Sequence, residues 1–260
     1  MSSKRTALLV ASAIAIASTA AVIRWKTSGA ARAGAPCQVA TYGLDLEQAA
    51  NATTIAAVGK RLSMPDHAVT IALAASLQEA RLHNLDHGDL DSLGLFQQRP
   101  SQGWGTPTQI LSPKYAAAAF YQHLALVDGW QTRSVTDAAQ QVQRSAAPNA
   151  YAQWEQEARA LAVAMTGELP AGLACRVNVA RTATPDPAVN AALSAELGSA
   201  SLGTTVTSTF GWTTAAWLIG HASQYHIGSI AFAGQIWQAR RGTWVAQPTA
   251  SQHIALNGSG

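Results

Sequence analysis

The sequence predicts a mainly α-helical chain that ends in a small α/β unit. Apolar residues recur three and four positions apart in successive segments as far as Gly167, which is the spacing of amphipathic helices. Capping and breaking residues separate these segments, and almost no strand-like run occurs among them. Farther along, residues 229–233 and 235–239 alternate on either side of Gly234, as the two strands of a hairpin do.

The N-terminus has the pattern of an export segment. Lys4 and Arg5 precede an uncharged stretch over residues 6–23, and further positive charges follow it. This arrangement is typical of a secretory signal peptide or of an uncleaved membrane anchor, and both place the rest of the chain outside the cytoplasm. We assign residues 1–36 to this segment and to an Ala-, Gly- and Ser-rich linker.

The first predicted domain spans residues 37–175 and consists of helices. One helix is expected over 45–62, capped by Asp45, and a second over 65–82, with a proline at its start. In the second helix Glu79 continues the stripe of apolar residues that packs inward. We expect this carboxyl group to be drawn partly out of water, which favours its protonated form.

A polar turn then leads into the remaining helices of this domain. The turn over 84–91 is rich in Gly and Asp, and a short helix is expected directly after it, over 92–98. Prolines and glycines exclude a long helix from 99–107 and favour a shaped loop. Later helices are expected to begin at Ser112-Pro113, at Thr136 and at Pro148-Asn149, the last one ending at Gly167.

Residues 176–190 are polar and contain two prolines, so we interpret them as a linker to a second domain over 191–260. That domain begins with a helix around 213–226. The hairpin and a final strand near 254–256 complete a small α/β unit. Its tryptophans fall at helix and strand spacing, so core packing accounts for them better than glycan binding does.

Two cysteines, Cys37 and Cys175, enclose the first domain. In an exported protein we expect them to pair in a disulfide, and two unrelated buried thiols are the alternative. Closing a loop of this length stabilises a folded chain by about 4 to 5 kcal/mol in the chain-entropy model.

Composition and charge limit the partners. Charged residues make up 12% of the chain, and the net charge is +3. This balance suits an anionic surface such as a cell wall, and it lacks the dense Lys and Arg clusters of a nucleic-acid binder. His83 and His87 lie four apart, with acidic residues nearby, but Asn84 and Gly88 interrupt the helix that a metal-binding pair needs. An ion-binding envelope protein is therefore the weakest hypothesis, and we expect no metal.

Two segments around the lone glutamate form a motif. They are Gln78-Glu79-Ala80-Arg81-Leu82 and, after the Gly/Asp turn, Ser92-Leu93-Gly94-Leu95-Phe96-Gln97. The motif resembles the lysozyme-like superfamily, and it is most similar to the soluble lytic transglycosylase and goose-type lysozyme branch. The match covers about residues 45–167. The resemblance implies a lysozyme-like, orthogonally packed helical domain in which Glu79 is the catalytic acid, Gln97 lines the sugar cleft and Ser92 supports the turn.

Further site residues follow from the resemblance and from position in the chain. In the transglycosylases a tyrosine from a later helix orients the glutamate, and Tyr151 matches that segment. Gln98, Arg99 and Trp104 are expected in the cleft. Trp104, in a Gly-flanked loop, either stacks on sugar or covers the core.

Cleavage of a glycosidic bond needs an acid that protonates the leaving oxygen, and a second group that deals with the developing cation. Asp86, Asp89 and Asp91 are available as second carboxylates. Asp91 is one residue out of step with the second acid of the c-type lysozymes, so we prefer it as the N-cap of the helix at 92–98. A missing second acid is typical of the lytic transglycosylases, in which one glutamate acts as acid and then as base and the product is a 1,6-anhydro sugar.

The sequence therefore predicts an exported enzyme that cleaves the MurNAc–GlcNAc β-1,4 bond of peptidoglycan, as a lytic transglycosylase or a muramidase. Its expected partners are the glycan strands, with no nucleic acid, no cofactor and membrane contact only through an N-terminal anchor. The family's Ala-Tyr-Asn-Ala-Gly segment is absent, and Ala138-Ala139-Gln140-Gln141-Val142-Gln143 stands in its place. This departure favours the alternative, a catalytically inactive module for wall binding or envelope assembly.

Overall fold

The computed structural model describes residues 34–145, 147, 149–180, 184–198 and 202–257, so the predicted export segment, apart from 34–36, lies outside the described residues. Helices and two antiparallel sheets make up the described chain. In chain order the elements are β1 (Cys37–Val39), β2 (Tyr42–Leu44), α1 (Leu46–Arg61), α2 (Asp66–Ala80), η1 (Pro100–Gln102), α3 (Pro107–Ile110), α4 (Pro113–Leu124), α5 (Val135–Gln143), η2 (Ala152–Trp154), α6 (Glu155–Met165), β3 (Ala174–Cys175), α7 (Ala188–Leu197), α8 (Ser208–Gly220), β4 (Ser229–Phe232), β5 (Gln235–Gln238), β6 (Thr243–Ala246) and β7 (Ala255–Asn257).

The prediction of a mainly α-helical chain, with an orthogonal helical domain ahead of a small α/β domain, is wrong. The described residues form eight α-helices and two antiparallel sheets, with 45% helix and 12% strand, which makes the protein mixed α/β. One sheet, in the order β2-β1-β3, lies within the part predicted to be helical. Its strands have two or three residues, too few for an alternating pattern to appear in the sequence.

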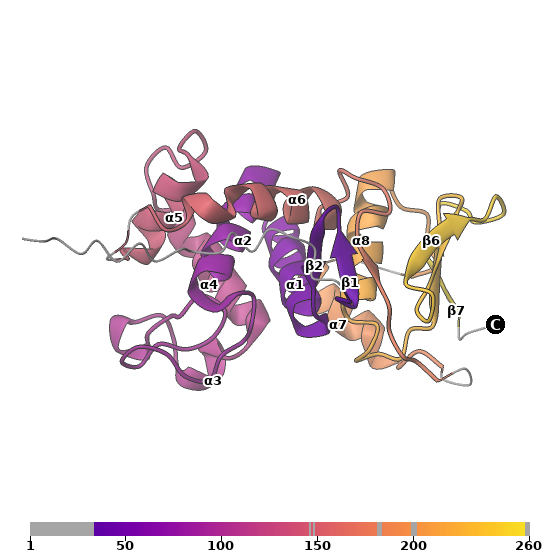
Figure 1. Ribbon diagram of the computed structural model, residues 1–260, viewed down its shortest axis with the longest axis horizontal. Helices are drawn as coiled ribbons and strands as arrows, with labels where there is room; N and C mark the ends of the chain where they lie inside the picture. Colours follow the sequence, from indigo (N-terminus) through magenta and orange to yellow (C-terminus); the bar gives the residue numbers. More distant parts are fainter. Residues whose placement is uncertain (1–33, 146, 148, 181–183, 199–201, 258–260) are drawn as a thin grey trace, which may run out of the picture.

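The elements are distributed along the long axis of the molecule, although not in chain order. Figure 1 shows α3, α4 and α5 at one end, α1, α2 and α6 in the middle, and α7, α8 and the β6-β5-β4-β7 sheet at the other end. Helix α2 packs against α5 and α6, while α1 packs against α4, α7 and α8. The two central helices therefore join both ends of the molecule.

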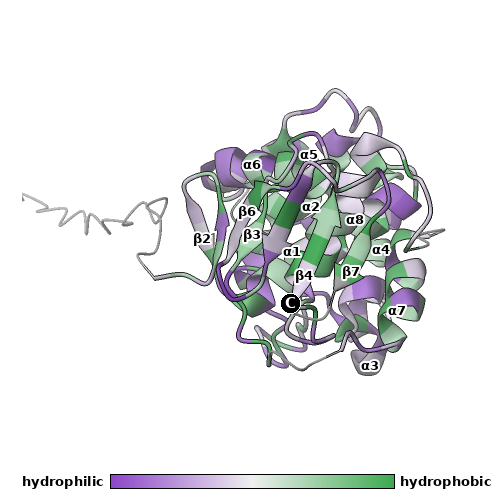
Figure 2. Cartoon of the chain, turned by 90° about the vertical axis from the view of Figure 1, so that its right-hand side faces the viewer, coloured by the Kyte–Doolittle hydropathy of each residue, from purple (hydrophilic) through white to green (hydrophobic). Residues whose placement is uncertain are grey.

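Helices α1 and α2 are buried on nearly all sides, and their alanines allow this close packing. In Figure 2 hydrophobic residues run along β4 and the helices behind it, while hydrophilic residues lie toward the rim. The core also continues through the predicted linker: Val177 and Val179 are buried, and α7 already begins at Ala188. The division into two domains stays a prediction, and the two parts share one hydrophobic core.

The four-stranded sheet packs on α8 through aromatic side chains. Trp212, Trp217 and Trp237 are at most 4% exposed, which confirms the prediction that they serve the core. Gly211 allows the helix to approach the sheet, because a Cβ at this position would lie 2.0 Å from the ring of Phe232. Strand β6 and helix α7 were not predicted from the sequence.

Capping residues predicted the start of α1 correctly, while α5 and α6 begin at other residues than predicted. Asp45 caps α1 in a capping box with Gln48, as predicted from its position. Helix α5 is capped by Ser134, two residues before the predicted start. Helix α6 begins at Glu155, later than predicted, and the proposed start at Pro148 lies outside the described residues.

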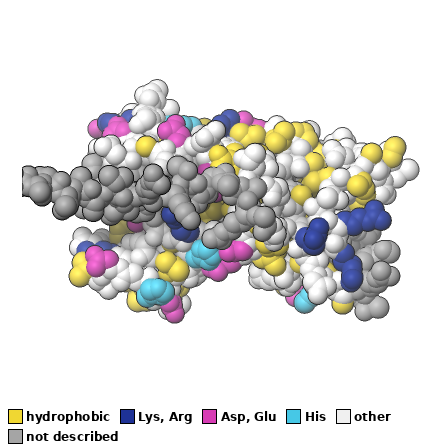
Figure 3. Space-filling model, viewed as in Figure 1, with side chains coloured by type: hydrophobic (Ala, Val, Ile, Leu, Met, Phe, Trp, Pro, Cys, Tyr) yellow, Lys and Arg dark blue, Asp and Glu magenta, His cyan; other side chains and the backbone are white. Residues whose placement is uncertain are grey.

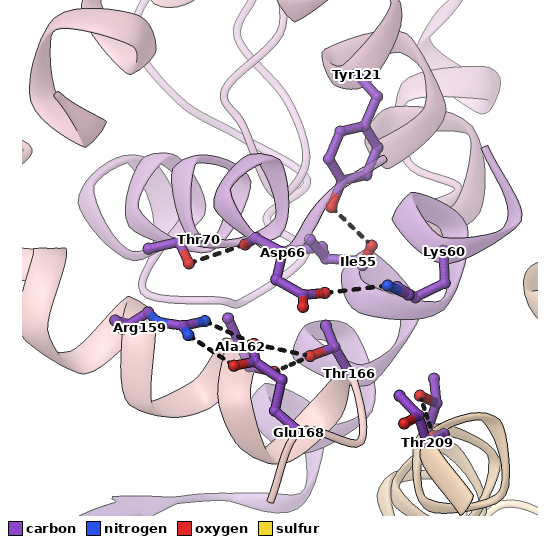
Figure 4. Close-up of polar contacts among 11 residues, drawn as sticks. Ile55, Lys60, Asp66, Thr70, Tyr121, Arg159, Ala162, Thr166, Glu168 and Thr209 are labelled. Carbon is purple, nitrogen blue, oxygen red and sulfur yellow. Dashed lines mark hydrogen bonds and ion pairs between the residues drawn. The ribbon is translucent and has the colours of Figure 1, made fainter. Parts of the chain in front are cut away.

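Polar contacts hold the central helices together away from the groove described below (Figure 4). Lys60 of α1 pairs with Asp66 of α2 at 3.1 Å, and Tyr121 of α4 donates a hydrogen bond to the Ile55 carbonyl of α1. Tyr121 is buried, and desolvation raises the pKa of its hydroxyl.

Cys37 and Cys175 form the predicted disulfide, which joins β1 to β3 over a sequence separation of 138 residues. Such a bond persists in an oxidising compartment, outside the reducing cytoplasm. No helix among the described residues has the length and apolarity needed to span a bilayer.

Candidate active site

A groove of about 800 Å³ lies where the ends of α2, α4 and α5 meet the loop between α2 and α3. Its lining combines carboxylates, amides, cations and aromatic rings: Glu79, Asp89, Ser92, Phe96, Gln97, Gln98, Arg99, Gln102, Trp104, His123, Leu126, Val127, Gln141, Val142, Gln143, Arg144 and Ser145. Most of the residues predicted from the sequence as a cleft are in this set. Tyr151 is not in the lining, and it contacts the groove through Glu79.

Glu79 lies in the last turn of α2 and is partly buried. Its Oε1 accepts a hydrogen bond of 2.6 Å from the hydroxyl of Tyr151, which is itself fully buried. Burial and the hydrogen bond to Glu79 both raise the pKa of the Tyr151 hydroxyl, so this group stays protonated and donates. No other described residue donates to the Glu79 carboxylate, which leaves Oε2 available to a ligand.

The neighbouring residue fixes the end of the same helix. Gln78 Oε1 accepts hydrogen bonds from Trp154 Nε1 at 2.8 Å and from Gln153 Nε2 at 3.1 Å. The helix ends at Ala80, and its C-cap residue Arg81 is in the left-handed conformation with its guanidinium over the Trp154 ring. The segment around η2 therefore holds the end of α2 on both sides of Glu79.

The predicted helix over 92–98 does not form. Leu93 and Gln98 instead exchange two backbone hydrogen bonds, and the chain between them turns tightly. Gly94 and Gln97 have positive φ angles of 75° and 47°, which a right-handed helix does not allow. A Cβ at Gly94 would also lie 2.8 Å from the Ile110 carbonyl oxygen.

The prediction that Asp91 caps this helix is therefore also wrong. Its carboxylate accepts hydrogen bonds from Arg99 Nε at 2.7 Å and from the backbone and hydroxyl of Ser101. The hydrogen bond from Arg99 is the largest cause that holds the pKa of the Asp91 carboxyl well below its ordinary value. This pairing also occupies the Arg99 guanidinium, although Arg99 lines the groove.

The two glutamines of the motif have different surroundings. Gln97 donates to the carbonyls of His87 and Gly94, so its amide braces the turn at the groove. Gln98 is 1% exposed and donates to the Ala116 carbonyl of α4, which makes it an anchor of the loop. Ser92 is buried, and its backbone N–H donates to the Asp89 carbonyl.

One end of the groove is aromatic and apolar. The indole of Trp104 stacks on the His123 imidazole with ring centroids 3.8 Å apart, and both rings line the groove. Leu126 follows at the end of α4 and is 80% exposed. Stacked rings with exposed apolar neighbours form a surface that suits the apolar face of a sugar. Trp104 was predicted from the sequence as a cleft residue, whereas His123 and Leu126 were not.

Two further charged groups line the groove: Asp89, one of the three candidate second carboxylates, and Arg144, which was not predicted from the sequence. In the described part of the chain the Asp89 carboxylate has no donor, whereas Asp86 pairs with His87 and Asp91 with Arg99. Arg144, the C-cap residue of α5, donates its guanidinium to no described residue. No sequence signal separates Asp89 from the other aspartates, because pairing across a folded loop decides which carboxylate stays unpaired.

The two histidines that were considered as a metal-binding pair, His83 and His87, contact different carboxylates. His83 contacts Asp45 at 3.0 Å, and His87 contacts Asp86 at 2.7 Å. No group of three or more His, Cys, Asp or Glu residues in the described part of the chain is arranged to hold a metal ion.

In comparisons with known proteins, no family model and no curated protein matches this chain. The roles of Glu79, Tyr151 and the cleft residues therefore stay predictions.

Proposed function

We propose that this protein is an exported enzyme that cleaves the β-1,4 bond between MurNAc and GlcNAc in peptidoglycan, with Glu79 as the general acid. The observation that carries the proposal is the Glu79 carboxylate, which lies in a groove of about 800 Å³ and is held through one oxygen by a buried tyrosine. The resemblance of the segments around Glu79 and Gln97 to lytic transglycosylases and the oxidising compartment inferred from the disulfide support the same function.

The geometry around the carboxylate suits proton transfer to a leaving group. Tyr151 occupies Oε1 and fixes the orientation of the carboxyl plane, so the proton can be carried on Oε2. Protonation of the glycosidic oxygen from Oε2 starts the cleavage, and the resulting carboxylate acts as a base in the second step. Trp104 and His123 hold a sugar ring at one end of the groove.

The second step can follow two routes. If the enzyme is a muramidase, Asp89 is the unpaired groove carboxylate that can position a water molecule. If it is a lytic transglycosylase, the muramic C6 hydroxyl attacks and no second carboxylate is needed. The two routes give different products, with a reducing end in the first and a 1,6-anhydro end in the second.

The test of the acid compares the whole chain with its Glu79→Gln variant on purified peptidoglycan. We expect the release of soluble muropeptides, measured by liquid chromatography and mass spectrometry, to fall by roughly a hundredfold to ten-thousandfold. Glu155→Gln is the matched control, because this carboxylate lines a different cavity, and it should keep full activity. Equal cleavage by Glu79→Gln and wild type would rule out Glu79 as the acid.

The same assay with Asp89→Asn distinguishes the two routes. Loss of activity, together with reducing ends from the wild type, supports hydrolysis with Asp89 as the second carboxylate. Full activity with 1,6-anhydro ends supports transglycosylation by Glu79 alone.

The alternative is a catalytically inactive module that binds the cell wall, and the replacement of the family's Ala-Tyr-Asn-Ala-Gly segment by residues 138–143 favours it. In this case wild type and Glu79→Gln would both sediment with peptidoglycan, and neither would release muropeptides.

A further inference from the structure

Among the described residues, the groove contains one guanidinium that has no partner. Of the two arginines in its lining, Arg99 is paired with Asp91 at 2.7 Å. Arg144 is exposed, and its guanidinium donates to no residue in the described part of the chain. Its five N–H donors, fixed in a plane, are therefore free to meet a ligand.

The backbone around Arg144 is firmly placed. Arg144 adopts the left-handed conformation with a φ of 51°, and its N–H donates to the Gln140 carbonyl at 2.8 Å. The preceding Gln143 donates to the Phe96 carbonyl, which ties the end of α5 to the turn on the other side of the groove. The following Ser145 also lines the groove that contains Glu79. Arg144 therefore belongs to the wall of the same groove that contains Glu79.

The surroundings of the groove are acidic overall, which gives a free cation there a large effect on ligands. Residues 34–175 contain twelve Asp and Glu against eight Lys and Arg, and the groove itself contains Glu79 and Asp89. On the face in Figure 3 carboxylates lie mainly toward the end with α2 to α5, where Lys and Arg side chains are interspersed with them. An anionic ligand would be repelled by this field except where a local cation receives it.

We propose that Arg144 binds a carboxylate carried by the glycan, so that the enzyme selects acidic muramic-acid strands over neutral chitin-like strands. This inference rests on the proposed function. The carboxylate has two possible sources: the lactyl group of a muramic acid without its peptide, or the acidic residues of an attached stem peptide. Both offer the planar pair of oxygens that a guanidinium binds through two parallel hydrogen bonds.

The experiment measures binding and cleavage with three ligands. Intact glycan strands carry stem carboxylates, strands treated with an amidase carry lactyl carboxylates, and chitooligosaccharides carry neither. In the Glu79→Gln background, which separates binding from cleavage, Arg144→Gln should lower the affinity for acidic strands by about tenfold to a hundredfold. Affinity for chitooligosaccharides should not change. Tryptophan fluorescence and calorimetry report both affinities.

Two further variants sharpen the result. Arg144→Lys keeps the charge but loses the planar fork, so its affinity for acidic strands should fall between those of the parent protein and the Arg144→Gln variant. Lys114→Gln is the matched control, because Lys114 is exposed, pairs with no described carboxylate and lies outside the groove. It should bind all three ligands like the parent protein.

The outcomes separate this inference from the proposed function. A loss confined to intact strands identifies the stem as the source, and a loss confined to stripped strands identifies the lactyl group. Unchanged binding of all strands by Arg144→Gln, or an equal loss for chitooligosaccharides, would overturn the inference. If the wild type cleaves no strand while Arg144→Gln still loses affinity for acidic strands, the proposed catalysis fails and the role of Arg144 stands.

Discussion

Glu79 and Tyr151 are 72 residues apart in the sequence and meet through a hydrogen bond of 2.6 Å. The tyrosine is fully buried and its hydroxyl pKa is raised, first by desolvation and then by Glu79, so it acts as a fixed donor rather than as a base. Its contact with Oε1 restricts the carboxyl group to one orientation. At the scale of single residues, the proposed chemistry therefore depends on positioning as well as on the acid itself.

Tyr151→Phe tests this positioning role. The change keeps the ring and removes the hydrogen bond, which is worth about 1.5 to 3 kcal/mol when the acceptor is charged. We expect kcat for peptidoglycan cleavage to fall by about tenfold to a hundredfold, with a small change in KM. Tyr121→Phe is the control, since Tyr121 is equally buried and donates to a backbone carbonyl outside the groove. It should lose about 1 kcal/mol of stability and keep its kcat. Equal kcat values for the two variants would contradict the role of Tyr151.

At the scale of elements, α1, α7 and α8 meet around a buried polar cluster. Glu196 of α7 accepts hydrogen bonds of 2.7 Å from both Thr54 of α1 and the Trp217 indole of α8. His221 follows α8, stacks on Trp217 and donates from Nδ1 to the Trp217 carbonyl. Burial lowers the pKa of His221, and the nearby Glu196 opposes this shift. Thr54 of α1 is thus joined to the C-terminal part by Glu196 and by His221, whose Nε2 lies 3.3 Å from the Thr54 hydroxyl.

This cluster predicts a loss of stability in acid. The unfolded chain binds a proton at His221 below about pH 6.5, whereas the folded chain resists it, so the free energy of unfolding falls as the pH drops below that value. Urea denaturation between pH 5 and pH 8 measures the effect. In His221→Gln the slope over this range should be smaller than in the wild type, while a change at the exposed His226 should leave it as it is. An unchanged slope in His221→Gln would exclude this source of pH dependence.

At the scale of the whole molecule, one core and one covalent link hold the chain together. Buried residues form a continuous cluster from β1 through α1, α2 and α8 to the four-stranded sheet. The disulfide links β1 to β3, and Trp237 of the sheet donates to the Cys175 carbonyl directly beside it. The bond therefore lies where the helical part and the sheet part meet.

Removal of this bond should destabilise the entire molecule. The Cys37→Ala/Cys175→Ala double variant gains the conformational freedom of a long unfolded loop, and we expect its free energy of unfolding to fall by about 4 to 5 kcal/mol. Guanidinium denaturation followed by circular dichroism and by tryptophan fluorescence measures this loss. The wild type with a reductant should match the variant. Separate transitions in the two signals would show that the two parts unfold independently.

The confirmed predictions concern interactions between residues that are close in the sequence. Asp45 was recognised as a cap because a capping box involves neighbours three residues apart. The helix predicted over 92–98 from its Ser-Leu-Gly-Leu-Phe-Gln motif does not form, because the left-handed Gly94 and Gln97 close a tight turn instead. Asp91 and Asp89 look alike in the sequence, and the approach of Arg99 to Asp91 is what leaves Asp89 unpaired. Each error concerns a contact made by the folded loop.

The sequence by itself determined the main helices, because caps and periodicity are carried by residues near one another in the chain. The pairing of the two cysteines was predictable because the chain contains no others. The candidate glutamate and its tyrosine came from the resemblance of two short motifs. Only the tertiary structure decided the three-stranded sheet, the continuous core and the unpaired Asp89 and Arg144. Those features depend on which distant segments neutralise or bury one another, and the free energy of such contacts has no signature within a short window of sequence.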